Sequence, residues 1–199
     1  MKNDNYHHGN LREALIDIAL DILEEEGSAG IKMRAVGKRA GVSASAAYRH
    51  FSDKSALLAA VAKRGFDELT IALNQVRTKA HLSVEEQLQE MGVIYVVFAV
   101  EHASQYRLMY GSEAIRTENY PDLAASAHKM AREYALLVKQ CQASGVMKGE
   151  TTTEILHVMW ASTHGAAMLV IDGFISPPDI YQYARNIVNY VDAGIREDS

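Results

Sequence analysis

Apolar residues recur every three or four positions along most of the chain, and this spacing predicts helices. The first apolar stretch, residues 11–23, predicts a helix that ends near Gly27, after three consecutive glutamates. Residues 33–40 predict a short second helix, which Gly41 ends because glycine tolerates the backbone conformation that follows a helix. Ser43 is a suitable N-cap for a third helix, which runs to about residue 50.

The later part of the chain predicts longer helices. Ser52 or Asp53 caps a fourth helix, which continues without a breaker to about residue 79. Ser83 with Glu86 three positions later is a capping-box pattern that opens a fifth helix through residue 100. Three further helices are predicted over residues 122–144, from Thr153 through residue 171, and over residues 180–195. Because neither an alternating strand pattern nor an internal repeat is evident, the sequence predicts an all-α protein of about nine helices.

Composition narrows the class of protein. The chain has 199 residues, of which 48% are apolar and 23% charged, with 13 glycines and 3 prolines; these values exclude disordered, collagen-like and low-complexity chains. The single cysteine, Cys141, permits no intrachain disulfide and fits a reducing compartment. The longest apolar run, residues 91–100, is too short to span a membrane, and the polar residues 1–10 do not resemble a secretory signal. We therefore expect a cytoplasmic protein.

Charge is distributed unevenly along the chain. The net charge is −5, but residues 1–65 carry ten basic and eight acidic side chains, whereas residues 66–199 carry ten basic and seventeen acidic ones. Residues 32–64 contain eight basic side chains against one acid, Asp53. A basic helix face exposed to solvent is the simplest explanation of such a stretch, and binding to nucleic acid is the functional one.

The spacing within this basic stretch favours nucleic-acid binding. Two short predicted helices joined by a tight turn with glycine form a helix-turn-helix pattern, in which Gly41 supplies a positive φ and Val42 fills the helix crossing. The small residues 44–47 are expected to let the second helix lie deep in a major groove. The side chains expected to reach phosphates are Tyr48, Arg49, His50 and Lys54.

The stretch from Met33 to Lys54 resembles the helix-turn-helix of the tetracycline-repressor-like (TetR) family of bacterial one-component regulators. The resemblance rests on Gly-Val-Ser at 41–43, Tyr-Arg-His-Phe at 48–51, and the lysine in the first turn of the next helix. It implies that bases or nearby backbone are contacted by Arg34, Ser43, Ala44 and Ser45, and phosphates by Tyr48, His50 and Lys54. Gly37 departs from the pattern, where alanine is more usual, at an expected cost of about 0.5–1 kcal/mol of helix stability.

A weaker resemblance involves the two ends of the chain. Residues 160–165, Trp-Ala-Ser-Thr-His-Gly, resemble the Trp-x-x-x-His-Gly signature of a TetR subgroup, and Tyr6-His-His-Gly-Asn-Leu-Arg12 resembles the N-terminal segment of that subgroup. His7 and His8 raise the alternative of a metal site. Adjacent side chains diverge, however, and no cysteine or carboxylate stands at ligand spacing around them, so we expect an arm near the DNA backbone and neither a metal nor a cofactor.

The expected domains are a DNA-binding domain at residues 1–65 and a ligand-binding and dimerisation domain at residues 66–199. A helix-turn-helix protein commonly reads a palindromic DNA site as a homodimer, and the last two predicted helices suit an isologous four-helix bundle. The expected dimer residues are Met159, Thr163, Ala167, Val170, Ala184, Ile187, Val188 and Val191.

In regulators of this kind the middle helices form a ligand pocket. The candidate residues are Tyr95, Phe98, His102, Tyr106, Met109, Tyr110, Tyr134, Cys141, Trp160 and His164. The alternative is that these aromatic, methionine and other side chains are ordinary core residues. Residues 91–100 are apolar on all sides, which predicts a buried central helix and suits a mostly apolar effector. Such an effector would shift the long helix that begins at Lys54 and release the operator. The resemblance to the family implies repression, which is the commoner mode of its members.

Besides a ligand-responsive regulator, the sequence leaves two alternative functions to consider, an enzyme and a sensor that does not bind DNA. An α-helical enzyme would need an acid and a base, such as Glu101 with His102 or His164 near Cys141. The sequence lacks the phosphate-loop, zinc-protease and serine-hydrolase motifs, and Cys141 lies among apolar helix residues, so we do not expect an enzyme. A dimeric sensor without DNA binding is the other rival, but the phosphate-reaching residues of the helix-turn-helix are all present.

Overall fold

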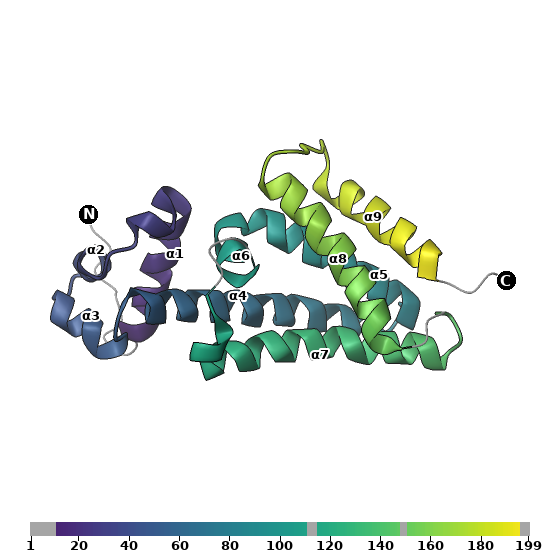
Figure 1. The fold of residues 1–199 in the computed structure, drawn as a ribbon, viewed down its shortest axis with the longest axis horizontal. Helices are drawn as coiled ribbons and strands as arrows, with labels where there is room; N and C mark the ends of the chain where they lie inside the picture. The colour runs from purple at the N-terminus through teal and green to yellow at the C-terminus, as the bar shows by residue number, and fades with distance from the viewer. Residues whose placement is uncertain (1–10, 111–114, 148–150, 196–199) are drawn as a thin grey trace. The chain divides into compact units, whose positions relative to one another are not determined.

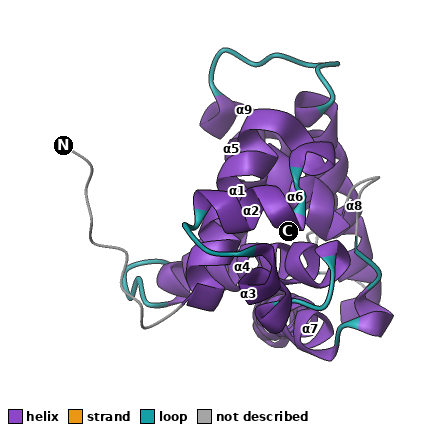
Figure 2. Ribbon diagram, turned by 90° about the vertical axis from the view of Figure 1, so that its left-hand side faces the viewer, coloured by secondary structure: helices purple, strands orange, loops and turns teal. Residues whose placement is uncertain are grey.

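A computed structural model describes residues 11–110, 115–147 and 151–195, which form nine α-helices and one 3-10 turn (Figure 1). Figure 2 shows these helices joined by loops and turns. The helices are α1 (Leu11–Gly30), α2 (Met33–Arg39), α3 (Ala44–His50), α4 (Lys54–Arg77), α5 (Val84–Glu101), α6 (Ala103–Tyr110), α7 (Pro121–Ala143), α8 (Thr152–Ile171) and α9 (Ile180–Ile195), with the turn η1 at Thr117–Asn119. The all-α prediction is confirmed. None of the described helices is long and apolar enough to cross a membrane.

Three details differ from the predicted helices or refine them. Helix α6 was not predicted. It has only eight residues and is separated from α5 by the single residue His102, whose backbone conformation is not helical (φ −115°, ψ 40°). Helix α8 begins earlier than predicted because its N-cap is Thr151, whose hydroxyl accepts from the Glu154 amide at 3.2 Å. Asp53, rather than Ser52, caps α4, since its carboxylate accepts from the Ala56 amide at 2.8 Å.

The chain divides into two compact units. The first contains the described residues up to Gly65 together with Ser104–Ala124, and the second contains Phe66–Ala103 and the described residues from Ala125 onward. Helix α4 is continuous and therefore contributes to both units. The predicted boundary at residue 65 differs in one respect, because α6 packs in the first unit: Gln105 Nε2 donates to the Val61 carbonyl at 3.1 Å.

In the first unit, α1 lies beside α2 and α3 (Figure 1), and its buried apolar side chains form one face. Its buried side chains stand at helical spacing and include Leu15, Ile18 and Ile22. The regular part of α1 ends at Gly27, whose φ of +71° is the left-handed conformation that glycine adopts without strain. The predicted end of the first helix is therefore confirmed, and the chain turns there toward α2.

In the second unit, α5 lies against both α8 and α9, which also contact each other (Figure 1). Its buried side chains include Met91, Tyr95 and Val96, so the predicted buried central helix is confirmed. Gly92 allows α5 and α9 to approach closely, because a Cβ added there would lie 2.8 Å from Val188 Cγ2.

We expect Gly92→Ala to lower the free energy of unfolding by about 1–3 kcal/mol, since valine is stiff in a helix and the added methyl group forces α5 and α9 apart. Denaturant unfolding measures the change. Gly194→Ala is the matched control, because a Cβ at Gly194 meets nothing within 4 Å, and it should leave stability unchanged or raise it. Equal stability of the Gly92 variant and the wild type would show that this close approach does not limit packing.

Candidate nucleic-acid interface

The turn between α2 and α3 is built from local backbone contacts. Gly41 has a φ of +71°, as predicted, and the Val42 amide donates to the Gly37 carbonyl at 2.9 Å. Gly37 is buried, and a Cβ added there would lie 3.3 Å from the Val42 carbonyl oxygen. The departure from alanine at this position therefore coincides with a close approach of the turn to α2.

Helix α3 begins as the sequence predicts. Ser43 is its N-cap, and the Ser43 hydroxyl accepts from the Ala46 amide at 3.2 Å. The Ser43 and Ser45 hydroxyl oxygens lie 2.9 Å apart. Ala46 and Ala47 are buried in the first unit, so the expectation that they face a groove is wrong: their small size lets α3 pack closely within the protein.

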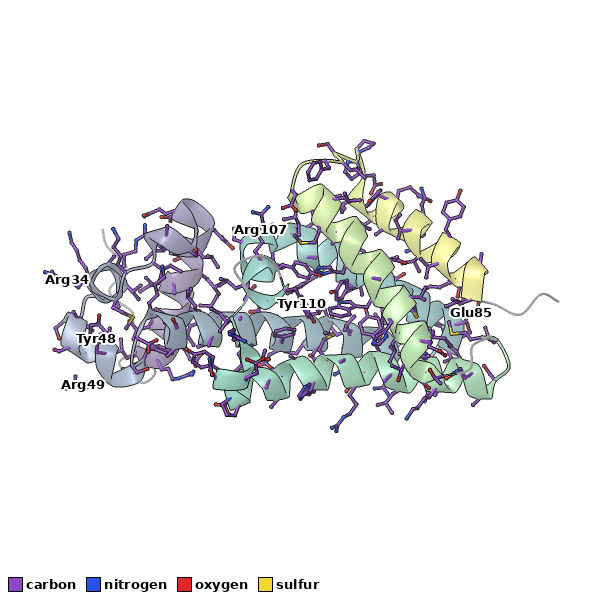
Figure 3. All side chains as sticks on the ribbon, viewed as in Figure 1. Arg34, Tyr48, Arg49, Glu85, Arg107 and Tyr110 are labelled. Carbon is purple, nitrogen blue, oxygen red and sulfur yellow. The ribbon has the colours of Figure 1, made fainter. Side chains whose placement is uncertain are left out.

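Most of the other predicted DNA-contacting residues are exposed. Arg34 and Arg49 project outward from α2 and α3, and Tyr48, also on α3, is 50% exposed (Figure 3). Ala44 and Lys54 are half-buried. The residues exposed to solvent are Arg34, Ser43, Ser45, Tyr48, Arg49 and His50. The structure thus gathers six predicted contact residues on exposed positions of one helix pair and its turn.

Acidic residues of α1 neutralise part of the basic stretch. Glu25 accepts a hydrogen bond from Arg39 Nη2 at 2.5 Å, which lowers the pKa of Glu25. Arg64 pairs with Asp17 and donates to Glu13 at 2.7 Å. These partners lie 14 or more residues apart in sequence, so a local charge count misses them. The positive potential near α2 and α3 therefore depends mainly on other side chains, Arg34 and Arg49 among them.

Lys54 has a protein partner. Its ammonium nitrogen donates to the Ser28 carbonyl oxygen at 2.5 Å, and this contact joins the first residue of α4 to the last residues of α1, after Gly27. The resemblance to the family had assigned this lysine to a phosphate. No sequence signal indicates the contact with Ser28, because the two residues are 26 positions apart.

The candidate effector residues fall into two groups. Tyr106, Met109 and Tyr110 belong to α6 in the first unit, where the two tyrosine rings lie 5.3 Å apart. The members in the second unit are Tyr95, Phe98, His102, Tyr134, Cys141, Trp160 and His164. The sequence-based set is therefore not a single cluster within either unit.

Within the second unit, three of these aromatic residues make hydrogen bonds or ring contacts. Trp160 Nε1 donates to the Tyr95 hydroxyl at 2.9 Å, and the Tyr134 hydroxyl donates to the Met91 carbonyl at 2.8 Å. The rings of Tyr95 and Tyr134 meet edge to face at a centroid distance of 6.2 Å. The ring of His164 lies 5.8 Å from that of Trp160, and burial lowers the pKa of His164, which favours its neutral form.

Cys141 is a packed apolar group. It has no exposed surface, and burial, together with the nearby Asp192 carboxylate, raises the pKa of its thiol to about 11. A thiol with this pKa is protonated near neutral pH and is a poor nucleophile. In addition, no three histidine, cysteine or acidic side chains within the described ranges are placed to hold a metal ion. His7 and His8 lie outside the described residues.

Half of the predicted dimer residues are buried within one chain. Thr163 and Ala167 of α8, with Ala184 and Val188 of α9, are at most 7% exposed. Partial exposure is shared by Met159, Val170, Ile187 and Val191. The apolar periodicity of α8 and α9 thus marks in large part the faces that pack inside the protein. The sequence did not distinguish these faces from a dimer surface, because packing within a chain and packing between chains produce the same spacing.

A second apolar stripe lies on the outer side of α8. Val158 and Leu169 are 48% and 43% exposed, and Ala161 and Gly165 stand between them at helical spacing. On α9, Tyr190 is 81% exposed. Large exposed apolar side chains at regular spacing mark interaction surfaces more often than isolated ones do. We refer to Val158, Ala161, Gly165 and Leu169 as the outer α8 stripe.

Comparison with known families matches both parts of the chain. Residues 15–61 match the family described as "Bacterial regulatory proteins, tetR family", and residues 88–190 match "Tetracyclin repressor-like, C-terminal domain". The HTH-type transcriptional regulator SAR2658 of Staphylococcus aureus (strain MRSA252) is 29% identical over 92 residues, which are 46% of this chain and 49% of that protein. SAUSA300_2515 of strain USA300 is 32% identical over 74 residues, 37% of this chain and 40% of that protein. These matched segments span half or less of each relative.

Solved structures match over nearly the whole chain. A protein of unknown function from Rhodococcus sp. RHA1 has a TM-score of 0.86 and 29% identity, covering 98% of this chain and 100% of the other. The fatty acid degradation regulator FadR from Bacillus halodurans has a TM-score of 0.77 at 15% identity, covering 96% and 98%. The second similarity shows a shared fold alone.

Proposed function

The chain belongs to the tetracycline-repressor-like (TetR) family of bacterial regulatory proteins, and from this premise we propose that it is a cytoplasmic transcriptional regulator that binds operator DNA as a homodimer and releases it when a small-molecule effector binds. One observation carries the proposal: the capped helix-turn-helix presents Arg34, Ser45, Tyr48 and Arg49 on exposed positions of α2 and α3. This is the arrangement in which a recognition helix reads a major groove.

The proposed contacts divide into two kinds. Arg34, Ser43, Ala44 and Ser45 lie at or near the starts of α2 and α3, so they are assigned to base edges and nearby backbone. The side chains near the end of α3, Tyr48, Arg49 and His50, are assigned to phosphates. Phosphate contacts hold the protein on the duplex, whereas the first group supplies the preference for sequence.

The experiment for this proposal is selection of bound sequences from randomised DNA duplexes by the full chain, repeated with Arg34→Ala. We expect the wild type to enrich a palindrome and the variant to lose preference at one position of each half-site, with about 5- to 150-fold weaker binding to the original site. Arg132→Ala on α7 is the matched control, because it removes an exposed arginine from the second unit and should leave the selected sequence unchanged. Absence of any enriched sequence with the wild type would overturn the proposed function.

We place the proposed dimer contact on the outer α8 stripe, together with the exposed residues of α9. The inner residues of α8 and α9 are occupied by packing within one chain, so a second copy is left with the outer faces. Ala161 and Gly165 let two helices approach closely, and Val158 and Leu169 supply apolar contact on either side. A pair of α8–α9 hairpins packed in this way forms a four-helix bundle.

The effector is assigned to the second unit, at the cluster of Tyr95, Tyr134 and Trp160. These residues come from α5, α7 and α8. They combine apolar ring surface with two hydrogen-bonded polar groups, the Trp160 indole and the Tyr134 hydroxyl. Membership of the Trp-x-x-x-His-Gly subgroup is part of this proposal, and the rings of its Trp160 and His164 lie 5.8 Å apart on one face of α8. A mostly apolar ligand suits such surroundings.

Continuity of α4 supports a route from the effector to the DNA. Residues 54–65 of this helix belong to the first unit and residues 66–77 to the second, where Arg77 forms an ion pair with Glu133 of α7. A displacement of α7 by the effector would therefore reach a helix whose first residue follows the helix-turn-helix. Coupling of about 1–3 kcal/mol corresponds to a 5- to 150-fold loss of operator affinity. Operator affinity that is unchanged across a panel of apolar ligands shown to bind the protein would contradict this route.

A further inference from the structure

The side chain of Lys54 differs from the exposed basic residues of α2 and α3. It is half-buried, and its ammonium nitrogen donates to the Ser28 carbonyl oxygen at 2.5 Å. The Ile31 amide donates to the same carbonyl at 3.2 Å, so this oxygen has two donors. A lysine held in this way contributes to the structure of the DNA-binding unit.

The neighbourhood of Ser28 explains why a cation binds there. The regular part of α1 ends at Gly27, directly after the run of acidic residues 24–26. Carbonyl groups at a helix C-terminus carry partial negative charge, and acidic side chains in the last turn add to it. No basic residue lies in the last turn of α1 itself. Lys54 therefore supplies, from α4, a positive charge at the Ser28 carbonyl, in addition to that of Arg39, which pairs with Glu25.

The two bonded residues stand on either side of the helix-turn-helix. Ser28 precedes α2, and Lys54 follows α3 as the first residue of α4. Their hydrogen bond closes a loop of chain that contains both DNA-binding helices. Ile31 and Phe51, at 1% and 4% exposure, anchor the same two connections in the apolar core of the unit. The bond thus joins the end of α1, before α2, to the start of α4, after α3.

We propose that Lys54 is a positioning residue for DNA binding: its bond to Ser28 holds the connections of α2 and α3 together and thereby sets the position of the recognition helix. The inference rests on the proposed function and replaces, for this one residue, the phosphate contact that family resemblance implies. The two roles predict different salt dependence, because each phosphate contact adds about 0.9 to the slope of log affinity against log salt, whereas a positioning contact adds nothing.

The test compares the wild-type chain with Lys54→Met and Lys54→Arg on two duplexes, the selected operator and a random sequence, at several salt concentrations. For Lys54→Met we expect about tenfold weaker operator binding, unchanged binding to the random duplex, and an unchanged salt slope. Lys54→Arg should restore most of the operator affinity, since it keeps the charge and the donors. Hydrogen exchange at the Ile31 amide should be faster in Lys54→Met, because the carbonyl that it bonds is no longer held.

Lys139→Met is the matched control, since this exposed lysine of α7 belongs to the second unit and should change none of these measurements. Equal weakening on both duplexes with a slope lower by about 0.9 per Lys54 would overturn the inference and restore the phosphate contact. Unchanged operator binding by Lys54→Met would overturn it as well. A wild type that prefers no duplex would instead overturn the proposed function, so the two failures are distinguishable.

Discussion

Gly165→Arg is expected to convert the protein to a monomer and to lower its affinity for the operator at least about 100-fold. Two linked reading heads bind a palindrome with an effective concentration that a single head lacks, and separating them removes that gain of about 10²- to 10⁴-fold. Because the substitution lies in the second unit, outside the helix-turn-helix, the loss would come from dimerisation and not from a changed DNA contact.

At Gly165 a substitution can disturb the proposed dimer without disturbing the packing of the single chain. A Cβ added there meets nothing within 4 Å, so the chain itself has room for a side chain. Replacing a glycine inside a helix also raises helix propensity, so the monomer should not lose stability. In the proposed dimer, however, the outer α8 stripe brings two helices together at this residue, and a charged side chain there is both too large and costly to bury.

Sedimentation velocity and titration of operator DNA measure the two effects of Gly165→Arg separately. Ala131→Arg is the matched control, because it adds the same side chain at an exposed alanine of α7 and should leave both the dimer and the DNA affinity unchanged. If Gly165→Arg remains dimeric and binds the operator as the wild type does, the second copy does not contact the outer α8 stripe.

The parts that sequence predicted well are those with local causes. The N-cap at Ser43, the positive φ at Gly41 and the capping box at Ser83 each depend on residues within a few positions, so the signal is contained in a short stretch. The buried face of α5 was predictable for a related reason, since a run of apolar residues on all sides of a helix has no exposed face to assign. Local chemistry thus located the helix-turn-helix and the central helix.

The remaining features depend on contacts between distant residues. Arg39 and Arg64 appear in sequence as part of a basic stretch, but the fold pairs them with acids of α1. Thr163 and Val188 stand on an apolar face, but periodicity does not say whether that face packs against α5 or against a second chain. Helix α6 is too short to produce a strong periodic signal. For the ion pairs and the apolar face, the identity of the partner decides the role, and a single sequence does not contain it.

Ser45→Glu should weaken operator binding at least about 100-fold at low salt while leaving the stability of the protein unchanged or slightly raised. Ser45 is exposed in the first turn of α3, where an acidic side chain interacts favourably with the helix dipole, so folding is not impaired. At the DNA, by contrast, each carboxylate of a dimer would face negatively charged phosphates, and juxtaposed like charges cost several kcal/mol. In this variant the midpoint of thermal unfolding should therefore stay the same or rise slightly, while the operator affinity from DNA titration falls.

Ser45→Gln separates the effect of charge from that of size, because glutamine resembles glutamate in shape but is neutral. Both substitutions remove the contact between the Ser43 and Ser45 hydroxyls, so any loss through that contact is common to the two variants. The glutamine variant should lose much less affinity, and the difference between the variants should shrink as salt screens the repulsion. If both bind the operator as the wild type does, the first turn of α3 does not lie at the DNA. A glutamate effect that persists at high salt would instead indicate a steric cause, because only an electrostatic one is screened.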